Sequence, residues 1–150
     1  MASLIGSYSL SFGLLFSVLI IFFSVRNLRD AEILDKKIIS FTLTQCFFVV
    51  ISFFGLIISF INSDFSNETV FNHSHTTKPL FYKISGTWGN HEGSLLLWLL
   101  VLTLFISIFL LKSNQQTKKY RIFTLLFQQI IIVGFFIFLI KTSSPFNYIF

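Results

Sequence analysis

The run IISFTLTQCFFVVISFFGLIISFI, from Ile38 to Ile61, is the strongest indication of the fold class of this chain. It carries no Asp, Glu, Lys or Arg, and it is long enough to cross the hydrocarbon core of a bilayer, which takes about 20 predominantly apolar residues. Because the run is continuous and does not alternate between apolar and polar residues, it predicts a membrane-spanning helix and excludes a transmembrane strand.

Three further runs of the same kind share the chain with it. The four predicted helices cover residues 5–25, 38–61, 94–111 and 122–140. Apolar residues make up 54% of the chain and charged residues 11%, with a mean hydropathy of +0.81, whereas soluble domains carry about 25% charged residues. The sequence therefore predicts an all-α membrane protein, with residues 1–150 forming a single module of four transmembrane helices.

Basic residues predict the orientation of this module. The long connection 62–93 holds only Lys78 and Lys83, whereas the two short connections are rich in basic residues. These are Arg26, Arg29, Lys36, Lys37, Lys112, Lys118, Lys119 and Arg121. By the positive-inside rule the short connections face the cytoplasm or matrix, so the amino terminus, the 62–93 loop and the tail from Lys141 are expected on the outer side. The net charge of +5 then reflects topology signals, and no nucleic acid is expected as a partner.

Amide side chains interrupt the predicted spans at Gln45, Gln128 and Gln129. An unpaired amide in hydrocarbon is costly, so these groups and Thr42 are expected to face other helices, of this chain or of a partner. Proton and ion pathways normally use ionisable groups, which the spans lack. The lone cysteine, Cys46, excludes an internal disulfide and is expected to be a small buried hydrophobe.

The 62–93 connection is long for a helix–helix loop and carries two weaker signals. His73 and His75 would lie on one face of a strand, as metal ligands require, but no third ligand is near in sequence, so no metal site is expected. Asn67 and Asn72 each begin a glycosylation acceptor triplet, a pattern that is common by chance.

The residues best suited to chemistry gather in TWGNHEGSLLLW, from Thr87 to Trp98. If Gly93 and Ser94 open the third helix, the carboxylate of Glu92 lies at its positive end, where it is stabilised by about 0.3–1 kcal/mol. His91 is then expected at the outer membrane face, where an imidazole can ligate haem or another metal or move a proton.

The same stretch also has a purely structural interpretation, in which it is an anchoring and capping turn. Trp88 would lie among the lipid headgroups, Glu92 would balance the helix dipole, and the glycines would form a tight bend. The candidate residues for a haem-proximal or structural motif are Trp88, Gly89, His91, Glu92, Gly93 and Trp98.

The longer stretch KISGTWGNHEGSLLLWLLVL, from Lys83 to Leu102, resembles the motif near the amino end of the CcmF/NrfE family of membrane haem lyases. Three other segments are similar to that family as well: IGSYSL at 5–10, NSDF at 62–65 and TSSPF at 142–146. The resemblance covers nearly the whole chain, although family proteins are several times longer.

Membership of this family implies a part in cytochrome c maturation, as a component of the lyase that attaches haem covalently to the Cys-x-x-Cys-His sites of apocytochrome c. The implied cofactor is haem, handled by the complete lyase. The implied partners are the remaining portion of the lyase, CcmH-like and CcmE-like proteins, and apocytochrome c, in the bacterial or mitochondrial inner membrane. The tryptophan-rich segment and haem-ligating histidines of the family lie beyond this chain, so no catalytic residue is assigned and the chain alone is expected to be inactive.

Two alternatives come from other functional classes. One is a small four-helix transporter or channel, which flux through liposomes containing only this chain would reveal. The other is a purely structural subunit of a larger membrane complex.

Overall fold

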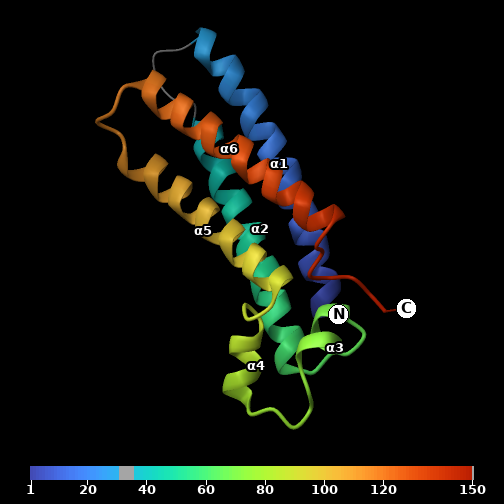
Figure 1. The fold of residues 1–150 in the computed structure, drawn as a ribbon. Helices are drawn as coiled ribbons and strands as arrows, with labels where there is room; N and C mark the ends of the chain where they lie inside the picture. Colours follow the sequence, from blue (N-terminus) through green and yellow to red (C-terminus); the bar gives the residue numbers. More distant parts are fainter. Residues whose placement is uncertain (31–35, 150) are drawn as a thin grey trace.

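The computed structural model describes residues 1–30 and 36–149, and side chains for 1–28 and 36–149. Arg29, one of the basic residues that predict the orientation, therefore has its side chain outside the described residues. The described residues form four long helices and two short ones. Figure 1 shows the long helices running side by side, with the short helices at one end. The long helices are α1 (Ala2–Asp30), α2 (Lys36–Ile61), α5 (His91–Lys112) and α6 (Lys118–Lys141), and the short ones are α3 (Glu68–His73) and α4 (Leu80–Gly86).

All four long helices are long and apolar enough to cross a membrane, so the predicted all-α architecture with four spans is confirmed. Each of these helices is longer than the apolar run that predicted it, since polar residues at the ends continue the helical turns. α1 packs against α2 and α6, α2 against α5, and α5 against α6. The amino terminus, α3, α4 and the carboxyl-terminal tail lie at the same end of the bundle (Figure 1), which we call the loop end.

Glycines allow α1 and α2 to touch along their backbones. A Cβ atom on Gly55 of α2 would lie 3.2 Å from the Cα atom of Gly6 on α1. On its other side Gly6 is covered by the ring of Phe146 in the tail, and Gly13 is covered by the ring of Phe136 on α6. Small residues are what permit such close approach between helices in a membrane, where van der Waals packing drives association.

A polar layer joins α1, α2 and α6 in the middle of the bundle. Gln129 Nε2 donates to Gln45 Oε1 at 2.9 Å, and Ser17 Oγ donates to Gln129 Oε1 at 3.1 Å, while Gln45 Nε2 donates to Ser17 Oγ. All three side chains are fully buried. The prediction that intramembrane amides face other helices is thus confirmed for Gln45 and Gln129. Thr42 instead donates to Ile38 O within its own helix, at 2.8 Å.

Basic residues at the opposite end of the bundle also hold helix ends together. Arg121, which is 8% exposed, donates from Nη2 to Leu110 O at 2.6 Å and from Nε to Ser113 Oγ at 2.9 Å. Lys118 Nζ donates to Asn27 O near the end of α1, at 2.5 Å. Cations are favourable at the carboxyl ends of helices, where carbonyl groups lack intrahelical partners.

Candidate functional site

The candidate motif folds as the turn that starts α5, and Asn90 organises it. Asn90 is 7% exposed, and its Oδ1 accepts a hydrogen bond from Gly93 N at 2.7 Å. Its Nδ2 donates to Gly86 O at 2.8 Å and to Thr87 O at 3.1 Å, so the same side chain also ends α4. Because Asn90 caps the helix, α5 begins at His91, earlier than the start at Ser94 that the apolar run predicted.

The two glycines of the motif differ in what surrounds them. A Cβ atom on Gly93 would collide with the main-chain carbonyl of Thr87, so the turn can close only around a glycine. A Cβ atom on Gly89 would be 3.4 Å from Ser85 O and would make ordinary contact. Sequence reasoning assigned both glycines to a tight bend, and the geometry requires only Gly93.

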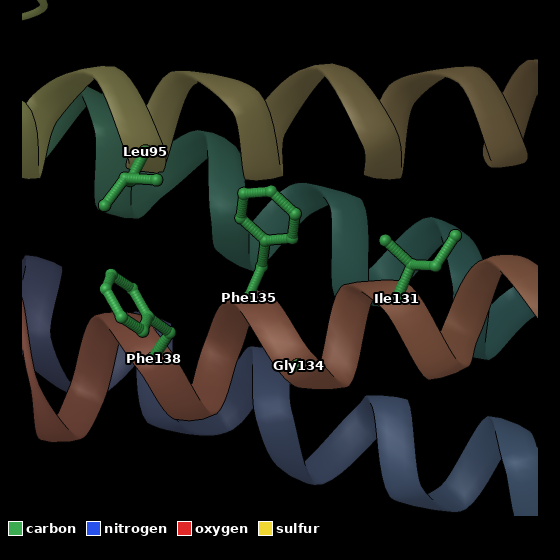
Figure 2. A pocket seen from close by; sticks show the side chains of 5 residues that line it. All are labelled: Leu95, Ile131, Gly134, Phe135 and Phe138. Carbon is green, nitrogen blue, oxygen red and sulfur yellow. The ribbon is translucent and has the colours of Figure 1, made fainter.

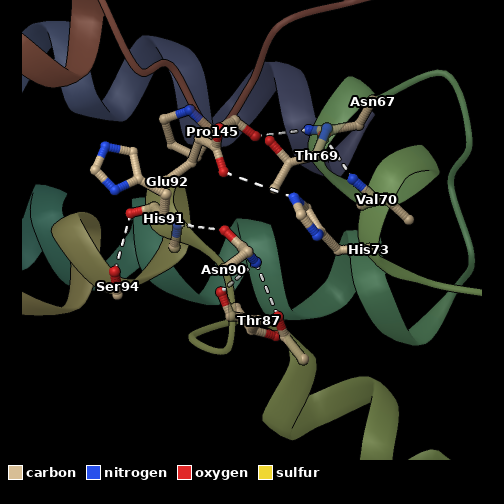
Figure 3. A network of polar contacts seen from close by, with 12 residues as sticks. Asn67, Thr69, Val70, His73, Thr87, Asn90, His91, Glu92, Ser94 and Pro145 are labelled. Atoms are coloured by element: carbon tan, nitrogen blue, oxygen red, sulfur yellow. Dashed lines mark hydrogen bonds and ion pairs between the residues drawn. The ribbon is translucent and has the colours of Figure 1, made fainter.

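Glu92 lies in the first turn of α5 and faces α3. Its Oε2 atom is 4.0 Å from His73 Nε2, and the side chains of Glu92 and His73 are 29% and 44% exposed. Figure 3 shows this contact bridging the two helices. The same Oε2 atom is itself buried and has no hydrogen-bond partner. The helix dipole stabilises a carboxylate at this place, in agreement with the interpretation drawn from the sequence.

His91 points away from this pair and toward the membrane face of α6. Its ring lies 6.4 Å from the ring of Phe138, at an interplanar angle of 82°. His91 is exposed, as are Trp98 (60%) on the same helix and Trp88 (41%) in the turn. The motif therefore separates into a buried capping part, Asn90 and Gly93, and an exposed aromatic part.

A polar cavity of ≈ 170 Å³ lies beside the Glu92–His73 contact. It is enclosed by α3, the start of α5 and the carboxyl-terminal tail. Its lining residues are Glu68, Thr69, Asn72, His73, Glu92, Thr142, Ser143, Ser144 and Asn147.

Asn67 joins three segments at the loop end, and Figure 3 shows its contacts with α3 and with Pro145 of the tail. Its Oδ1 accepts from Thr69 N at 2.9 Å and from Val70 N at 3.2 Å, which caps α3. Its Nδ2 donates to Ser3 Oγ at 3.1 Å and to Pro145 O at 2.9 Å. Since Asn67 is fully buried, its acceptor triplet does not present a free amide for glycosylation.

The two loop histidines do not converge. His73 contacts Glu92, whereas His75 pairs with Thr77 through Nδ1 at 2.9 Å. Within residues 1–30 and 36–149, no group of three or more His, Cys, Asp or Glu side chains is arranged to hold a metal ion. Cys46 is buried, as expected for a small hydrophobe.

Haem, which the family resemblance implies for the complete lyase, requires an axial ligand beside an apolar cavity that excludes water. His91 is the histidine that borders an apolar surface, at Phe138, but it is exposed. Since His73 and His75 are engaged elsewhere, no second imidazole faces it among the described residues. These residues do not form a haem site on their own, and we assign no step of haem chemistry to them.

Comparisons with known proteins place the chain among longer proteins. No family model matches it. Cytochrome c-type biogenesis protein CycK of Bradyrhizobium diazoefficiens is 40% identical over 127 residues, covering 82% of this chain and 19% of CycK. CcmF of Haemophilus influenzae is 33% identical over 147 residues, covering 95% of this chain and 22% of that protein. The solved structure of a cytochrome c haem lyase CcmF matches with a TM-score of 0.83 and 25% identity, over 98% of this chain and 25% of that one.

Four apolar helices, with a folded connection that holds α3 and α4 at one end, define a multi-pass α-helical membrane protein. The relatives give the family: the chain belongs to the CcmF/NrfE family of cytochrome c-type biogenesis proteins, as its amino-terminal portion. It spans less than a quarter of the length of the two relatives named above.

The sequence singles out Gly93 in the turn before α5, but it does not single out Asn90, which caps the helix. Asn90 directly precedes an apolar helical run, which is the usual position of a capping residue and could have been used to find it. Asn67 and its contacts with Ser3 and Pro145 carry no comparable local signal, because the partners are far apart in the chain.

Proposed function

We propose that this chain is the amino-terminal module of a cytochrome c haem lyase and that it acts only together with the remaining portion of the lyase. The complete lyase would attach haem to apocytochrome c, receiving haem from a CcmE-like protein and apocytochrome from CcmH-like proteins. The observation that carries the proposal is the likeness to a solved haem lyase over 98% of this chain.

Within that function, the module would hold the start of α5 and the tail in a fixed arrangement at the membrane surface. Asn67, Asn90 and Gly93 supply hydrogen bonds and close packing for this arrangement. His91, Trp88 and Trp98 are exposed and therefore available to the rest of the lyase or to its haem.

Complementation tests this function. A bacterium lacking its own haem lyase would receive the carboxyl-terminal remainder of Bradyrhizobium diazoefficiens CycK, with the matching CycK amino-terminal segment as the positive control. Replacing that segment with this chain should restore covalently bound haem on cytochrome c, and either part alone should give none. Flux through liposomes containing only this chain, without haem attachment, would instead identify a transporter or channel.

A second experiment tests the side of the membrane. We propose that the loop end faces the periplasm or intermembrane space, because the basic connections lie at the other end. In a Cys46→Ser background, a membrane-impermeant maleimide added to intact cells should label His75→Cys, at the exposed loop end, but not Gln115→Cys, at the exposed opposite end. The reverse pattern would invert the orientation.

If haem attachment is restored, two substitutions then ask what the exposed motif contributes. Trp88→Ala and His91→Ala should lower haem attachment while leaving membrane insertion unchanged, since both side chains are exposed. Unchanged haem attachment in both variants would mean that the motif has only a structural role.

A further inference from the structure

An apolar groove runs between α5 and α6 on the outside of the bundle. It has a volume of ≈ 350 Å³ and is lined by Leu95, Ile131, Gly134, Phe135 and Phe138. Figure 2 shows the Leu95 side chain extending from α5 toward α6, and the side chains of Ile131 and Phe135 extending from α6 toward α5. Gly134 lies between Ile131 and Phe138 along α6 and has no side chain to cover its backbone. A groove of this kind on a membrane helix pair is filled either by lipid or by another helix.

Gly134 is the first observation that favours a second helix packing closely in the groove. A Cβ atom added to Gly134 would meet nothing within 4 Å, whereas the spanning glycines Gly6, Gly13 and Gly55 are all pressed by atoms of this chain. A glycine inside a helix costs roughly 0.5–1 kcal/mol relative to alanine. Small residues at membrane helix faces normally let another backbone approach. No described residue of this chain fills the space that Gly134 leaves open.

Gln128 is the second, independent sign. It lies on the same stripe of α6 as Ile131, Phe135 and Phe138, at helical spacings of three, seven and ten residues. It makes no hydrogen bond with any described residue, although its neighbour Gln129 is fully buried and paired with Gln45. Lipid chains cannot bond an amide, so a bare amide at this depth calls for a polar partner from another helix.

We propose that the α5–α6 groove is the docking surface for a membrane-spanning helix from the remaining portion of the haem lyase. This inference rests on the proposed function above. The solved haem lyase holds this fold in only 25% of its chain, so most of that protein is available to cover a face left open here. The docked helix carries a hydrogen-bonding side chain opposite Gln128 and approaches closely at Gly134.

The first test fills the groove. Gly134→Phe places a ring where no described atom lies within 4 Å of the added Cβ, so the module itself should fold as before. Its co-purification with the CycK remainder should fall about tenfold, which corresponds to about 1.4 kcal/mol. Val18→Phe, at a side chain on α1 that is 55% exposed, is the matched control and should leave co-purification unchanged. Equal behaviour of the two variants would overturn the proposal.

The amide gives a smaller and separate effect. Gln128→Leu should lower co-purification about threefold, the equivalent of the roughly 0.6 kcal/mol that an interhelical hydrogen bond contributes on average. Phe22→Leu, on α1 and away from the groove, at a side chain that is 60% exposed, should have no effect. If Gln128→Leu and Phe22→Leu behave alike, the amide has no docking role.

Photo-crosslinking identifies the occupant. Benzoylphenylalanine in place of Phe138 should crosslink this chain to the CycK remainder, whereas the same group in place of Phe22 on α1, which is 60% exposed, should not. A crosslinked pair of identical chains, or no protein adduct, would overturn the proposal in favour of a second copy or of lipid.

Haem attachment by the unsubstituted pair separates the two proposals. If it occurs and the groove variants have no effect, only the docking surface is wrong. If it fails while the CycK segments complement one another, the proposed function fails and the docking surface with it.

Discussion

The helix pairs α1–α2 and α5–α6 use glycine in opposite ways. In the first pair Gly55 and Gly6 bring two backbones of the same chain into contact. In the second pair Gly134 faces outward, next to an unfilled apolar groove. The α1–α2 pair is therefore closed by atoms of this chain, whereas the α5–α6 pair presents an apolar surface that the described residues do not cover.

The largest effect is expected from filling the closed pair. Gly55→Leu would force a branched side chain against the backbone of α1 and should lower the free energy of unfolding by about 3 kcal/mol or more. Thermal unfolding in detergent, followed by tryptophan fluorescence, measures the loss. Gly134→Leu is the matched control and should unfold near the wild-type temperature. Similar losses in both variants would show that the two pairs are equally closed.

The adjacent residues Gln128 and Gln129 differ in the same way, since only Gln129 is paired within the bundle. Gln129→Leu leaves the buried Gln45 Oε1 acceptor and the buried Ser17 hydroxyl donor without a partner. This loss should lower the free energy of unfolding by about 1–3 kcal/mol. Gln128→Leu removes a side chain that has no hydrogen-bond partner among the described residues, and it should leave the module's stability unchanged. Unfolding of the two variants side by side checks this, and a larger loss in Gln128→Leu would contradict the assigned faces.

A moderate effect is expected at the start of α5, which forms one wall of the groove. Asn90→Ala removes the cap of that helix and should destabilise it by about 1 kcal/mol. The helical circular dichroism signal during thermal unfolding measures the change. Asn72→Ala, at an exposed position in α3, serves as the control. No difference between them would mean that the cap does not stabilise α5.

The smallest effect, and one of opposite sign, is expected at the open glycine. Gly134→Ala should stabilise the isolated module by about 0.5 kcal/mol, because alanine loses less backbone entropy in a helix and its methyl group meets nothing. In the presence of the CycK remainder the same substitution should weaken association. A variant that loses stability on its own would show that the groove closes within this chain.

The candidate motif stands out in the sequence because its signals are local, and its functional role stays a prediction. Trp88, His91 and Glu92 were selected because polar and aromatic groups before an apolar run stand out in the printed sequence. The start of α5 was placed too late because the apolar run begins at Leu95 and the cap at Asn90 precedes it. The contact between Glu92 and His73 could not be foreseen, since it depends on how α3 folds back over the bundle.

Membrane insertion and the number of spans follow from the apolar runs of the sequence alone. The transfer of apolar residues into hydrocarbon is nearly additive along a run. Nothing additive separates Gln128 from Gln129, or Gly55 from Gly134. Adjacent residues on a helix point about 100° apart, so one glutamine meets the polar layer and the other does not. Which glycine is covered likewise depends on a second helix, and that neighbour exists only once the bundle is packed.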